Sequence, residues 1–405
     1  MKKMKLTTKI FLGLILGIVV GLFMQSIPNV AQTYIKPFGT LFLNMIKMII
    51  VPLVFSSLIV GAASIGDPKS LGRIGGKTIV YYLATTAIAV SIGLLLGKII
   101  HPGSGLTIPV DANSAAAEAP SIVSTLLNII PKNPLKGLVE GNILQVITFA
   151  LFLGIGCTAI GEKSKSFVSF FESLANIMYK ITSFIMELAP YGIFALIVPV
   201  VSEYGIDVLK PLSLVIFAVY LGCILHALIV YSSAVKIFGK LNPTKFLKGI
   251  APAAITAFST TSSSGTLPVT IKCTRENLGI SEKIASFVLP LGATINMDGT
   301  ALYQGVCALF IAQVYGIELT LAQMATIVLT ATLGSIGTAG VPGGGFIMLT
   351  LVLQSVGLPL DGLVLIGGID RILDMARTSV NVVGDASCAV VVAATEDGLD
   401  PVTQS

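Results

Sequence analysis

The chain has 405 residues, of which 54% are hydrophobic and only 11% are charged. Soluble domains carry about a quarter charged residues, so a chain with a mean hydropathy of +0.92 must have lipid rather than water as its main solvent. The formal net charge of +5 is modest and gives no indication of nucleic-acid binding. The composition therefore predicts a membrane protein.

Apolar runs of about 20 residues predict membrane-spanning helices. The continuous runs cover residues 8–27, 39–62, 78–100, 139–160, 166–201, 209–236, 281–316 and 362–395. The first run could be mistaken for a signal peptide, but it is longer than a usual hydrophobic core and no A-x-A site follows it, so we expect a retained span. Two further runs, 244–275 and 321–357, are interrupted by Gly, Ser and Pro.

The distribution of lysine and arginine predicts the orientation of the spans. If the N-terminus is cytoplasmic, that side holds the dense basic groups near residues 2–9, 69–77, 163–165 and 236–248, and the other side has only scattered lysines. Cytoplasmic loops carry an excess of basic residues, so we expect both termini in the cytoplasm. The turn-rich segment 101–134 is then an external loop.

The few cysteines and histidines argue against two common site chemistries. The five cysteines form no C-x-x-C pair and most lie in apolar runs, so we expect small buried side chains rather than disulfides or a zinc site. Neither His101 nor His226 belongs to an H-E-x-x-H motif, which argues against a metalloprotease.

The two interrupted runs share a pattern. Both contain Ser-x-Gly-Thr, at 263–266 and at 335–338, a proline follows each, and a span carrying Asn and Asp comes next. Irregular backbone within a membrane persists only where protein or a wet cavity surrounds it, and paired broken segments indicate a transporter's central site. We expect two re-entrant helical hairpins in inverted repeats, whose tips offer N–H groups to an anion and carbonyl groups to cations. A pair of ordinary kinks is the alternative.

The last predicted span carries a stripe of polar and charged residues. Asp370, Asp374, Arg377, Asn381 and Asp385 follow the spacing i, i+4, i+7, i+11 and i+15, which places them on one helical face. Ionisable groups at membrane depth usually face a functional interior. A structural salt bridge between Asp374 and Arg377 is the alternative, but it leaves Asn381 and Asp385 unexplained.

These residue types suit an amino acid with a second carboxylate. Arg377 offers a planar fork to a carboxylate, and Asp374 can accept hydrogen bonds from an α-ammonium group. Hard oxygens that suit Na⁺ come from Asn296, Asp298, Asn381 and Asp385. Buried aspartates also need compensating cations. Taken alone, one polar cluster in the third span indicates packing: Tyr82, Thr85 and Thr86.

Four motifs, in this order, make the chain resemble the dicarboxylate/amino acid:cation symporter family. They are SSSGTLP at 262–268, NMDGT at 296–300, SIGTAGVPGGG at 335–345 and DMARTSVNVVGD at 374–385. The family includes archaeal aspartate transporters, bacterial proton- or sodium-glutamate symporters and mammalian excitatory amino acid transporters. The resemblance covers nearly the whole chain and implies a transporter of the inner (cytoplasmic) membrane rather than an enzyme.

The resemblance implies an all-α membrane protein with eight transmembrane helices and two re-entrant hairpins, assembled in lipid as a homotrimer. Residues 1–77 (spans 1 and 2) and 101–208 (the external loop with spans 4 and 5) would form a static scaffold. Residues 78–100 (span 3) and 209–395 (spans 6 to 8 with both hairpins) would form a transport domain that moves as an elevator. The second hairpin would be the outer gate, and 396–405 a cytoplasmic tail.

The resemblance also implies ligands for an acidic amino acid and for about three Na⁺ ions. Substrate contacts would come from Ser263, Met297, Thr300, Val341, Gly345, Asp374, Arg377, Thr378 and Asn381. One Na⁺ would use the carbonyl groups of Gly292, Asn296 and Asn381 with the carboxylate of Asp385. A second would use backbone oxygens of Thr294, Ser335, Ile336 and Thr338. A third would use Tyr82, Thr85, Thr86, Asn296 and Asp298.

The chain departs from the family at two positions. Archaeal members carry an arginine immediately before the serine triplet, where this chain has Thr261, and mammalian members place an arginine where this chain has Met375. That arginine is thought to tune gating, so its absence bears on kinetics and on coupling to H⁺ or K⁺. Arg371 occupies a different position and could partly take its place.

The leading hypothesis is Na⁺-coupled symport of glutamate, aspartate or both. H⁺-coupled glutamate symport is the main alternative, and the matching sodium-ligand positions favour Na⁺. Neutral-amino-acid carriers lack an arginine at the position of Arg377, and Asp374 argues against a C4-dicarboxylate. A channel would need a continuous polar pore, and an enzyme would need a nucleophile–base pair that these motifs do not supply.

Overall fold

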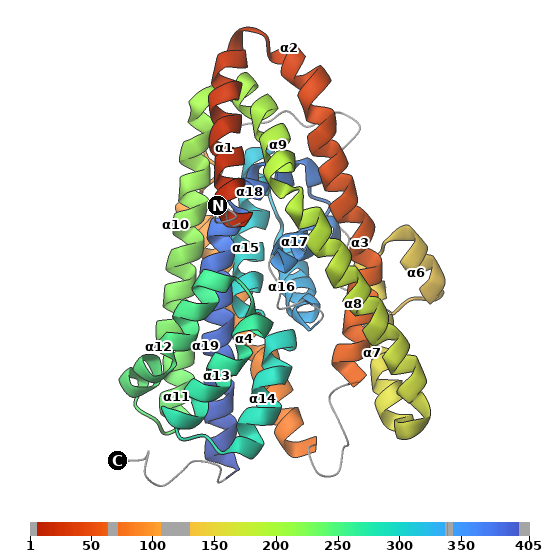
Figure 1. Cartoon of the computed structure of the whole chain (residues 1–405), viewed down its shortest axis with the longest axis vertical. Helices are drawn as coiled ribbons and strands as arrows, with labels where there is room; N and C mark the ends of the chain where they lie inside the picture. Colours follow the sequence, from red (N-terminus) through yellow and green to blue (C-terminus); the bar gives the residue numbers. More distant parts are fainter. Residues whose placement is uncertain (1–5, 64–71, 107–129, 337, 339–342, 397–405) are drawn as a thin grey trace, which may run out of the picture.

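The computed structural model describes residues 6–63, 72–106, 130–336, 338 and 343–396. Regular secondary structure within these ranges is helical (Figure 1), which confirms the expected all-α class for the described part of the chain. Most of the predicted external loop and all but the first residue of the predicted tail lie outside the described residues, as does the predicted substrate contact Val341.

The N-terminal half contains long helices joined by short 3₁₀ or π turns. In chain order the elements are α1 (Leu6–Phe23), η1 (Met24–Ser26), α2 (Pro28–Val30), η2 (Ala31–Ile35), α3 (Lys36–Ala63), α4 (Gly72–Ile100), α6 (Pro134–Glu140), α7 (Ile143–Ile160), η4 (Gly161–Ser164), α8 (Lys165–Glu187), α9 (Ala189–Tyr204) and η5 (Gly205–Val208).

The C-terminal half has more breaks between its helices. The elements are α10 (Leu209–Leu225), η6 (His226–Tyr231), α11 (Ser232–Ile237), α12 (Pro243–Thr260), α13 (Ser263–Glu276), α14 (Glu282–Ile295), α15 (Asp298–Val314), α16 (Leu321–Ser335), α17 (Gly344–Ser355), η7 (Leu360–Gly362), α18 (Leu363–Gly367) and α19 (Asp370–Thr395).

Five helical stretches in the described residues are long and apolar enough to cross a membrane. They are Thr8–Ser26, Arg73–Ile100, Gln145–Met178, Leu209–Ile237 and Asp370–Thr395. Large apolar side chains remain exposed on several of them, for example Leu16, Phe152 and Phe217. Because such surfaces are unfavourable in water and favourable in lipid, the chain is a multi-pass membrane protein.

The helices pack in two groups. In one, α1 and α9 run side by side and α3 lies against α7, α8 and α9. In the other, α4, α10, α14 and α15 pack with α19, and the pairs α12/α13 and α16/α17 join them. In Figure 1 the pair α12/α13 lies near α14 at the lower end of the molecule, and α16/α17 lies near its centre. Contacts such as α17 with α3 and α18 with α9 link the two groups.

The predicted continuous span 281–316 is wrong in one respect, because the structure divides it into α14 and α15. The chain leaves the helical conformation at Asn296, whose φ and ψ are −86° and 100°, and at Met297, whose values are −125° and 45°. The Asn296 N–H closes the last turn of α14 on the Gly292 carbonyl at 2.8 Å. A hydropathy pattern cannot predict this break, because the segments on both sides of it are apolar.

Each interrupted run forms a pair of helices with a short connection. The C-cap of α12 is Thr261, whose φ of 52° is left-handed. The N-cap of α13 is Ser262, whose hydroxyl accepts from the Gly265 N–H at 3.0 Å. α16 begins with a capping box at Thr320, and α17 begins after Gly343, whose φ is 83°. The connection between α12 and α13 therefore ends one helix and starts the next with local caps.

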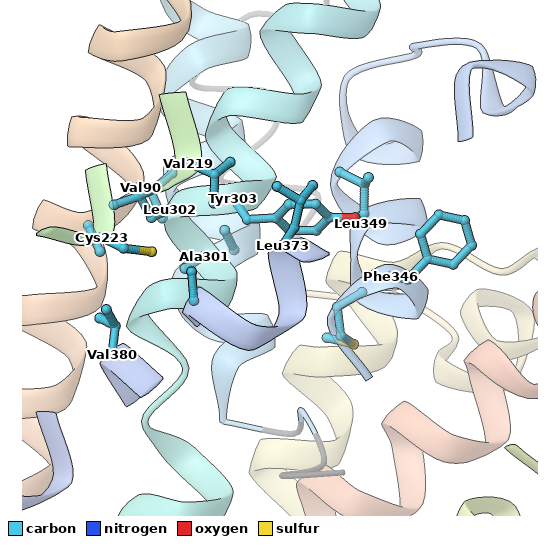
Figure 2. Close-up of a cluster of buried hydrophobic side chains, with 14 of the residues drawn as sticks. Val90, Val219, Cys223, Ala301, Leu302, Tyr303, Phe346, Leu349, Leu373 and Val380 are labelled. Atoms are coloured by element: carbon cyan, nitrogen blue, oxygen red, sulfur yellow. The ribbon is translucent and has the colours of Figure 1, made fainter. Parts of the chain in front are cut away.

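Tightly packed apolar side chains form a core at the centre of the second helix group. Figure 2 shows Val90 of α4, Val219 and Cys223 of α10 and Leu302 of α15, all of which are buried. A Cβ atom on Gly93 would lie 2.1 Å from the Leu302 carbonyl oxygen, so α4 and α15 touch backbone to backbone. Small residues permit such close approach between helices in membranes.

Candidate functional site

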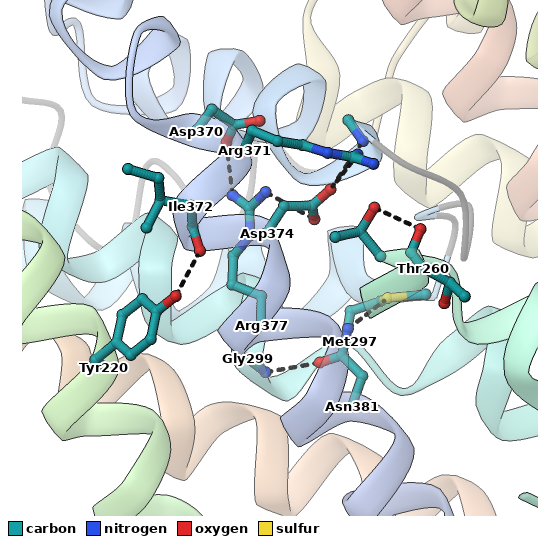
Figure 3. Close-up of polar contacts among 12 residues, drawn as sticks. Tyr220, Thr260, Met297, Gly299, Asp370, Arg371, Ile372, Asp374, Arg377 and Asn381 are labelled. Atoms are coloured by element: carbon teal, nitrogen blue, oxygen red, sulfur yellow. Dashed lines mark hydrogen bonds and ion pairs between the residues drawn. The ribbon is translucent and has the colours of Figure 1, made fainter. Parts of the chain in front are cut away.

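Arg377 is at the centre of a buried set of charges on α19. Its side chain is fully buried, and it donates from Nη1 to Asp370 Oδ1 and from Nη2 to Asp374 Oδ1, both at 2.9 Å (Figure 3). The guanidinium also lies 4.0 Å from the centre of the Tyr303 ring, a favourable cation–π distance. A buried guanidinium persists only when it is paired in this way, so α19 presents a carboxylate-binding fork to the interior.

The second oxygen of Asp374 faces the start of α17. Asp374 Oδ2 accepts from the Gly343 N–H at 3.2 Å and lies 3.5 Å from Arg371 Nη1. A Cβ atom on Gly345 would lie 3.2 Å from the Arg377 Cζ atom, so a larger residue there would require the guanidinium to shift by a few tenths of an ångström. The start of α17 thus lies directly against the charged centre.

The backbone break between α14 and α15 is fixed by Asn381 of α19. Asn381 Oδ1 accepts from the Gly299 N–H at 2.8 Å, and its Nδ2 lies 3.2 Å from Met297 Sδ (Figure 3). A Cβ atom on Gly299 would lie 2.4 Å from the Arg377 carbonyl oxygen, so the break packs tightly on α19. Thr300 follows, and its Cγ2 would be 3.0 Å from a Cβ on Gly345.

Two other predicted substrate contacts have a less direct placement. Ser263 at the start of α13 and Thr378 beside Arg377 are both buried. Figure 3 shows Thr260, the last residue of α12, on the same side of the charged centre as Met297 and Asn381. The described hydrogen bonds do not join Ser263 or Thr378 to the charged centre.

A first group of predicted ligand residues meets at Asp385. Asn296 Nδ2 donates to Asp385 Oδ1 at 2.9 Å and to the Asn381 carbonyl at 3.0 Å. A Cβ atom on Gly292 would lie 2.5 Å from Asp385 Oδ1 and 2.4 Å from the Tyr82 hydroxyl. The four residues predicted for the first sodium ion therefore meet around one buried carboxylate.

A second group of oxygens surrounds Asp298. The Thr86 hydroxyl lies 2.6 Å from Asp298 Oδ1 and 2.7 Å from the Tyr82 carbonyl, and the Thr85 hydroxyl lies 3.2 Å from that carbonyl. The Thr86 hydroxyl has one hydrogen, so it cannot donate to both the Tyr82 carbonyl and Asp298 Oδ1. Asn296 Oδ1 is also buried and has no hydrogen-bond partner within the described residues. Such an arrangement of oxygens suits a hard cation.

Among the residues predicted for another sodium ion, the Thr338 N–H donates to the Ser335 carbonyl at 3.2 Å, but the described hydrogen bonds do not join Thr294 to either residue. The hydroxyl groups of Ser335 and Thr338 bond within their own segment, to the carbonyls of Thr332 at 2.7 Å and Gly334 at 2.9 Å. The Thr294 hydroxyl bonds the Leu291 carbonyl at 2.9 Å. Ile336 lies in the same turn, next to residues outside the described part.

The oxygen groups differ from a typical transition-metal site. Across the described ranges, no three His, Cys, Asp or Glu side chains gather as ligands for such an ion. The oxygens come instead from hydroxyl, carbonyl and amide groups with single carboxylates, which are ligands of hard cations.

Sequence reasoning missed two residues at the Asp298 carboxylate. His226 Nε2 lies 3.1 Å and the Tyr231 hydroxyl 2.7 Å from Asp298 Oδ2. Both belong to η6, inside a continuous apolar run, where a histidine and a tyrosine give no periodic signal. Asp370 belongs to the stripe that the sequence predicts, but its direct pairing with Arg377 is shown only by the structure.

Long apolar helices around a buried charged centre define a multi-pass membrane transporter. The chain belongs to the Sodium:dicarboxylate symporter family, whose sequence profile matches residues 6–395. This confirms the family that the four motifs predicted.

Three relatives match over nearly their full length. The Proton/sodium-glutamate symport protein of Geobacillus stearothermophilus is 43% identical, over 96% of this chain and 94% of the relative. The protein of the same description from Bacillus subtilis (strain 168) is 40% identical, over 99% and 95%. The Proton/glutamate-aspartate symporter of Escherichia coli (strain K12) is 37% identical, over 98% and 94%.

Proposed function

We propose that the chain carries glutamate, aspartate or both across the cell membrane by secondary active symport with Na⁺, with H⁺ as the alternative coupling ion. The observation that supports this most is the fully buried Arg377 held between two carboxylates. It occurs in a chain that is 43% identical to a protein described as a proton/sodium-glutamate symporter.

An acidic amino acid carries the charges that can exchange with these ion pairs. Its side-chain carboxylate replaces one aspartate on the Arg377 fork, and its ammonium group bonds Asp374. A neutral amino acid lacks that carboxylate, and a C4-dicarboxylate lacks the ammonium group. We assign the substrate contacts to Ser263, Met297, Thr300, Val341, Gly345, Asp374, Arg377, Thr378 and Asn381.

Sodium ions are proposed as co-transported cargo at the oxygen groups around Asp385 and Asp298. Each ion neutralises a buried aspartate, whose charge is unfavourable in a low-dielectric interior without a partner. The unpartnered Asn296 Oδ1 supports a ligand role at the second group. A third ion at Thr294, Ser335, Ile336 and Thr338 rests on the motif match alone.

The proposed architecture has eight spans, formed by α1, α3, α4, α7, α8–α9, α10–α11, α14–α15 and α18–α19, with α12/α13 and α16/α17 as re-entrant hairpins. The two packing groups support a division into a scaffold (residues 1–77 and 101–208) and a transport domain (78–100 and 209–395). We propose elevator movement between them, a homotrimer, and cytoplasmic termini.

Uptake of labelled glutamate and aspartate into proteoliposomes tests the function and its coupling. An inward Na⁺ gradient at equal internal and external pH is expected to drive accumulation, and unlabelled succinate or alanine is expected to compete weakly. Accumulation driven by a proton gradient in Na⁺-free buffer would establish the alternative coupling ion. Transport of succinate in preference to both amino acids would contradict the acidic-amino-acid assignment.

A further inference from the structure

The π-helical segment η6 brings two polar side chains to one point. His226 and Tyr231 are its first and last residues. In a regular α-helix, residues five apart point about 140° away from each other. Where hydrogen bonds run from i to i+5, such residues point in much closer directions, and the two rings pack edge to face with centroids 4.6 Å apart.

Both side chains donate to the same oxygen of a buried carboxylate. The Tyr231 hydroxyl lies 2.7 Å and His226 Nε2 lies 3.1 Å from Asp298 Oδ2. A carboxylate only accepts, so Nε2 carries the hydrogen in this contact. The other oxygen, Oδ1, is left to face the hydroxyl of Thr86 at 2.6 Å and, beyond it, the Tyr82 carbonyl.

Within the described residues, His226 makes no other polar contact that would explain its position. Its side chain is fully buried, and Nδ1 has no hydrogen-bond partner among the described residues. Burying an unpaired nitrogen is unfavourable, as is a π turn within an α-helix, and π turns occur frequently at functional sites. Packing alone would favour an apolar residue at position 226. The contact with Asp298 therefore accounts for both the buried histidine and the π turn.

We infer that His226 and Tyr231 are positioning residues for Asp298, which hold Oδ2 so that Oδ1 stays directed at the oxygens of α4. The inference rests on the cation site proposed at Asp298. Loss of a residue that hydrogen-bonds to a metal-ligating side chain typically lowers metal affinity or activity by about 10–100-fold. Without its two donors the carboxylate can rotate away from Thr86, so the affinity for Na⁺ falls.

The test is the Na⁺ dependence of glutamate uptake by the full-length protein in proteoliposomes. His226→Leu and Tyr231→Phe are each expected to raise the Na⁺ concentration for half-maximal uptake by about tenfold, whereas His226→Gln, which keeps an N–H donor, stays within about threefold of the wild type. The maximal rate and the KM for glutamate at saturating Na⁺ should change little, which a general folding defect would not produce.

His101→Leu is the matched control, because His101 is exposed and lies at the end of α4. Unchanged Na⁺ dependence in both His226→Leu and Tyr231→Phe would overturn the inference while leaving the proposed function intact. If His226→Leu fails to fold, Tyr231→Phe, which removes only one oxygen atom, still decides. Wild-type uptake that does not respond to Na⁺ would instead contradict the proposed sodium coupling, and the inference with it.

Discussion

Arg377 satisfies its charge within the protein by bonding two aspartates of its own helix. If Arg377 binds the substrate as proposed, a carboxylate ligand does not enter an empty positive site but exchanges with a carboxylate already bound. The exchange keeps the guanidinium paired throughout, which avoids the penalty of several kcal/mol for an isolated buried charge. In the proposed site, selectivity for an acidic substrate would follow from that requirement.

Removing the guanidinium should abolish recognition of the acidic substrate. Arg377→Ala removes the guanidinium that pairs with Asp370 and Asp374, of which Asp374 keeps Arg371 at 3.5 Å, and breaking a buried pair is unfavourable by about 3–5 kcal/mol. We expect the KM for glutamate to rise at least ~100-fold. Arg377→Lys keeps the charge but not the fork, so it should be intermediate in initial-rate uptake assays.

Arg275→Ala is the control for this prediction, since its side chain is 44% exposed and pairs with Glu282 at the surface. Exposed pairs contribute little, so the control should transport normally. Gel filtration in detergent verifies that each variant remains folded. Full glutamate affinity in a folded Arg377→Ala protein would show that the substrate carboxylate binds elsewhere.

How far the site could be predicted depends on the kind of signal each residue gives. The stripe from Asp370 to Asp385 follows helical periodicity, so its shared face could be predicted before the structure was known. His226 and Tyr231 are five residues apart and converge only because the helix takes a π turn. Local backbone irregularity leaves no mark in hydropathy or periodicity, and these contacts therefore required coordinates.

At the scale of helices, small residues determine how closely elements approach. Gly13, Gly17 and Gly21 recur every four residues on the face of α1 that meets α9. A Cβ atom on Gly13 would lie 2.3 Å from the Pro190 carbonyl oxygen. Helices in lipid associate largely through such close backbone packing, so this stripe holds α1 on α9.

Gly13→Ala is expected to destabilise the protein, because the added methyl group meets backbone rather than a movable side chain. Overpacking of this kind is unfavourable by about 1–3 kcal/mol, measurable as a lower Tm in detergent. Gly156→Ala on α7 is the matched control, since a Cβ there has nothing within 4 Å. An equal Tm for both variants would mean that α1 can shift on α9 without loss.

An ion cluster joins the start of α4 to the end of α19. Glu396 accepts from Arg73 Nη2 and from Lys77 Nζ, both at 2.5 Å. These hydrogen bonds, first from Arg73 and then from Lys77, hold the pKa of the Glu396 carboxyl below its ordinary value of 4.5. Stabilisation from a lowered pKa is complete above that ordinary value and is lost as the pH falls through the folded-state pKa.

Glu396→Gln should therefore lower the Tm by a small amount at neutral pH, about 1–2 °C, because Arg73 is largely exposed and surface pairs are weak. The difference from wild type should stay constant down to about pH 5 and then shrink on further acidification. Glu140→Gln, in the exposed pair with Lys136, is the control. A difference that grows at low pH would contradict the assignment.

Some helix boundaries can likewise be predicted from the hydropathy pattern, whereas others depend on backbone geometry. Nearly every apolar run predicted from the sequence contains a helix, because burying about 20 apolar residues in lipid is a strong and local requirement. The break at Asn296 and Met297 was not predicted from the run 281–316. It depends on Asn381, which caps the new helix from a distant part of the chain.

At the scale of the whole molecule, the helices pack as two groups with few contacts between them. One such contact lies between α1 and the connection before α19, where a Cβ atom on Gly368 would lie 2.9 Å from Leu14 Cδ1. Leu14 falls in the proposed scaffold and Gly368 in the proposed transport domain. A bond between these positions would fix the two groups in one relative placement.

If transport requires movement between the groups, cross-linking Leu14→Cys with Gly368→Cys by Hg²⁺ should abolish glutamate uptake, and excess thiol should restore it. The chain's own five cysteines are buried, so they compete little. The control pair is Gly97→Cys with Leu309→Cys, whose Cβ atoms would be 3.0 Å apart within one group; cross-linking there should leave uptake intact. If the protein still takes up glutamate when the Leu14→Cys and Gly368→Cys pair is fully cross-linked, elevator movement between the two helix groups is excluded, because a covalent bond between the groups prevents them from sliding past each other.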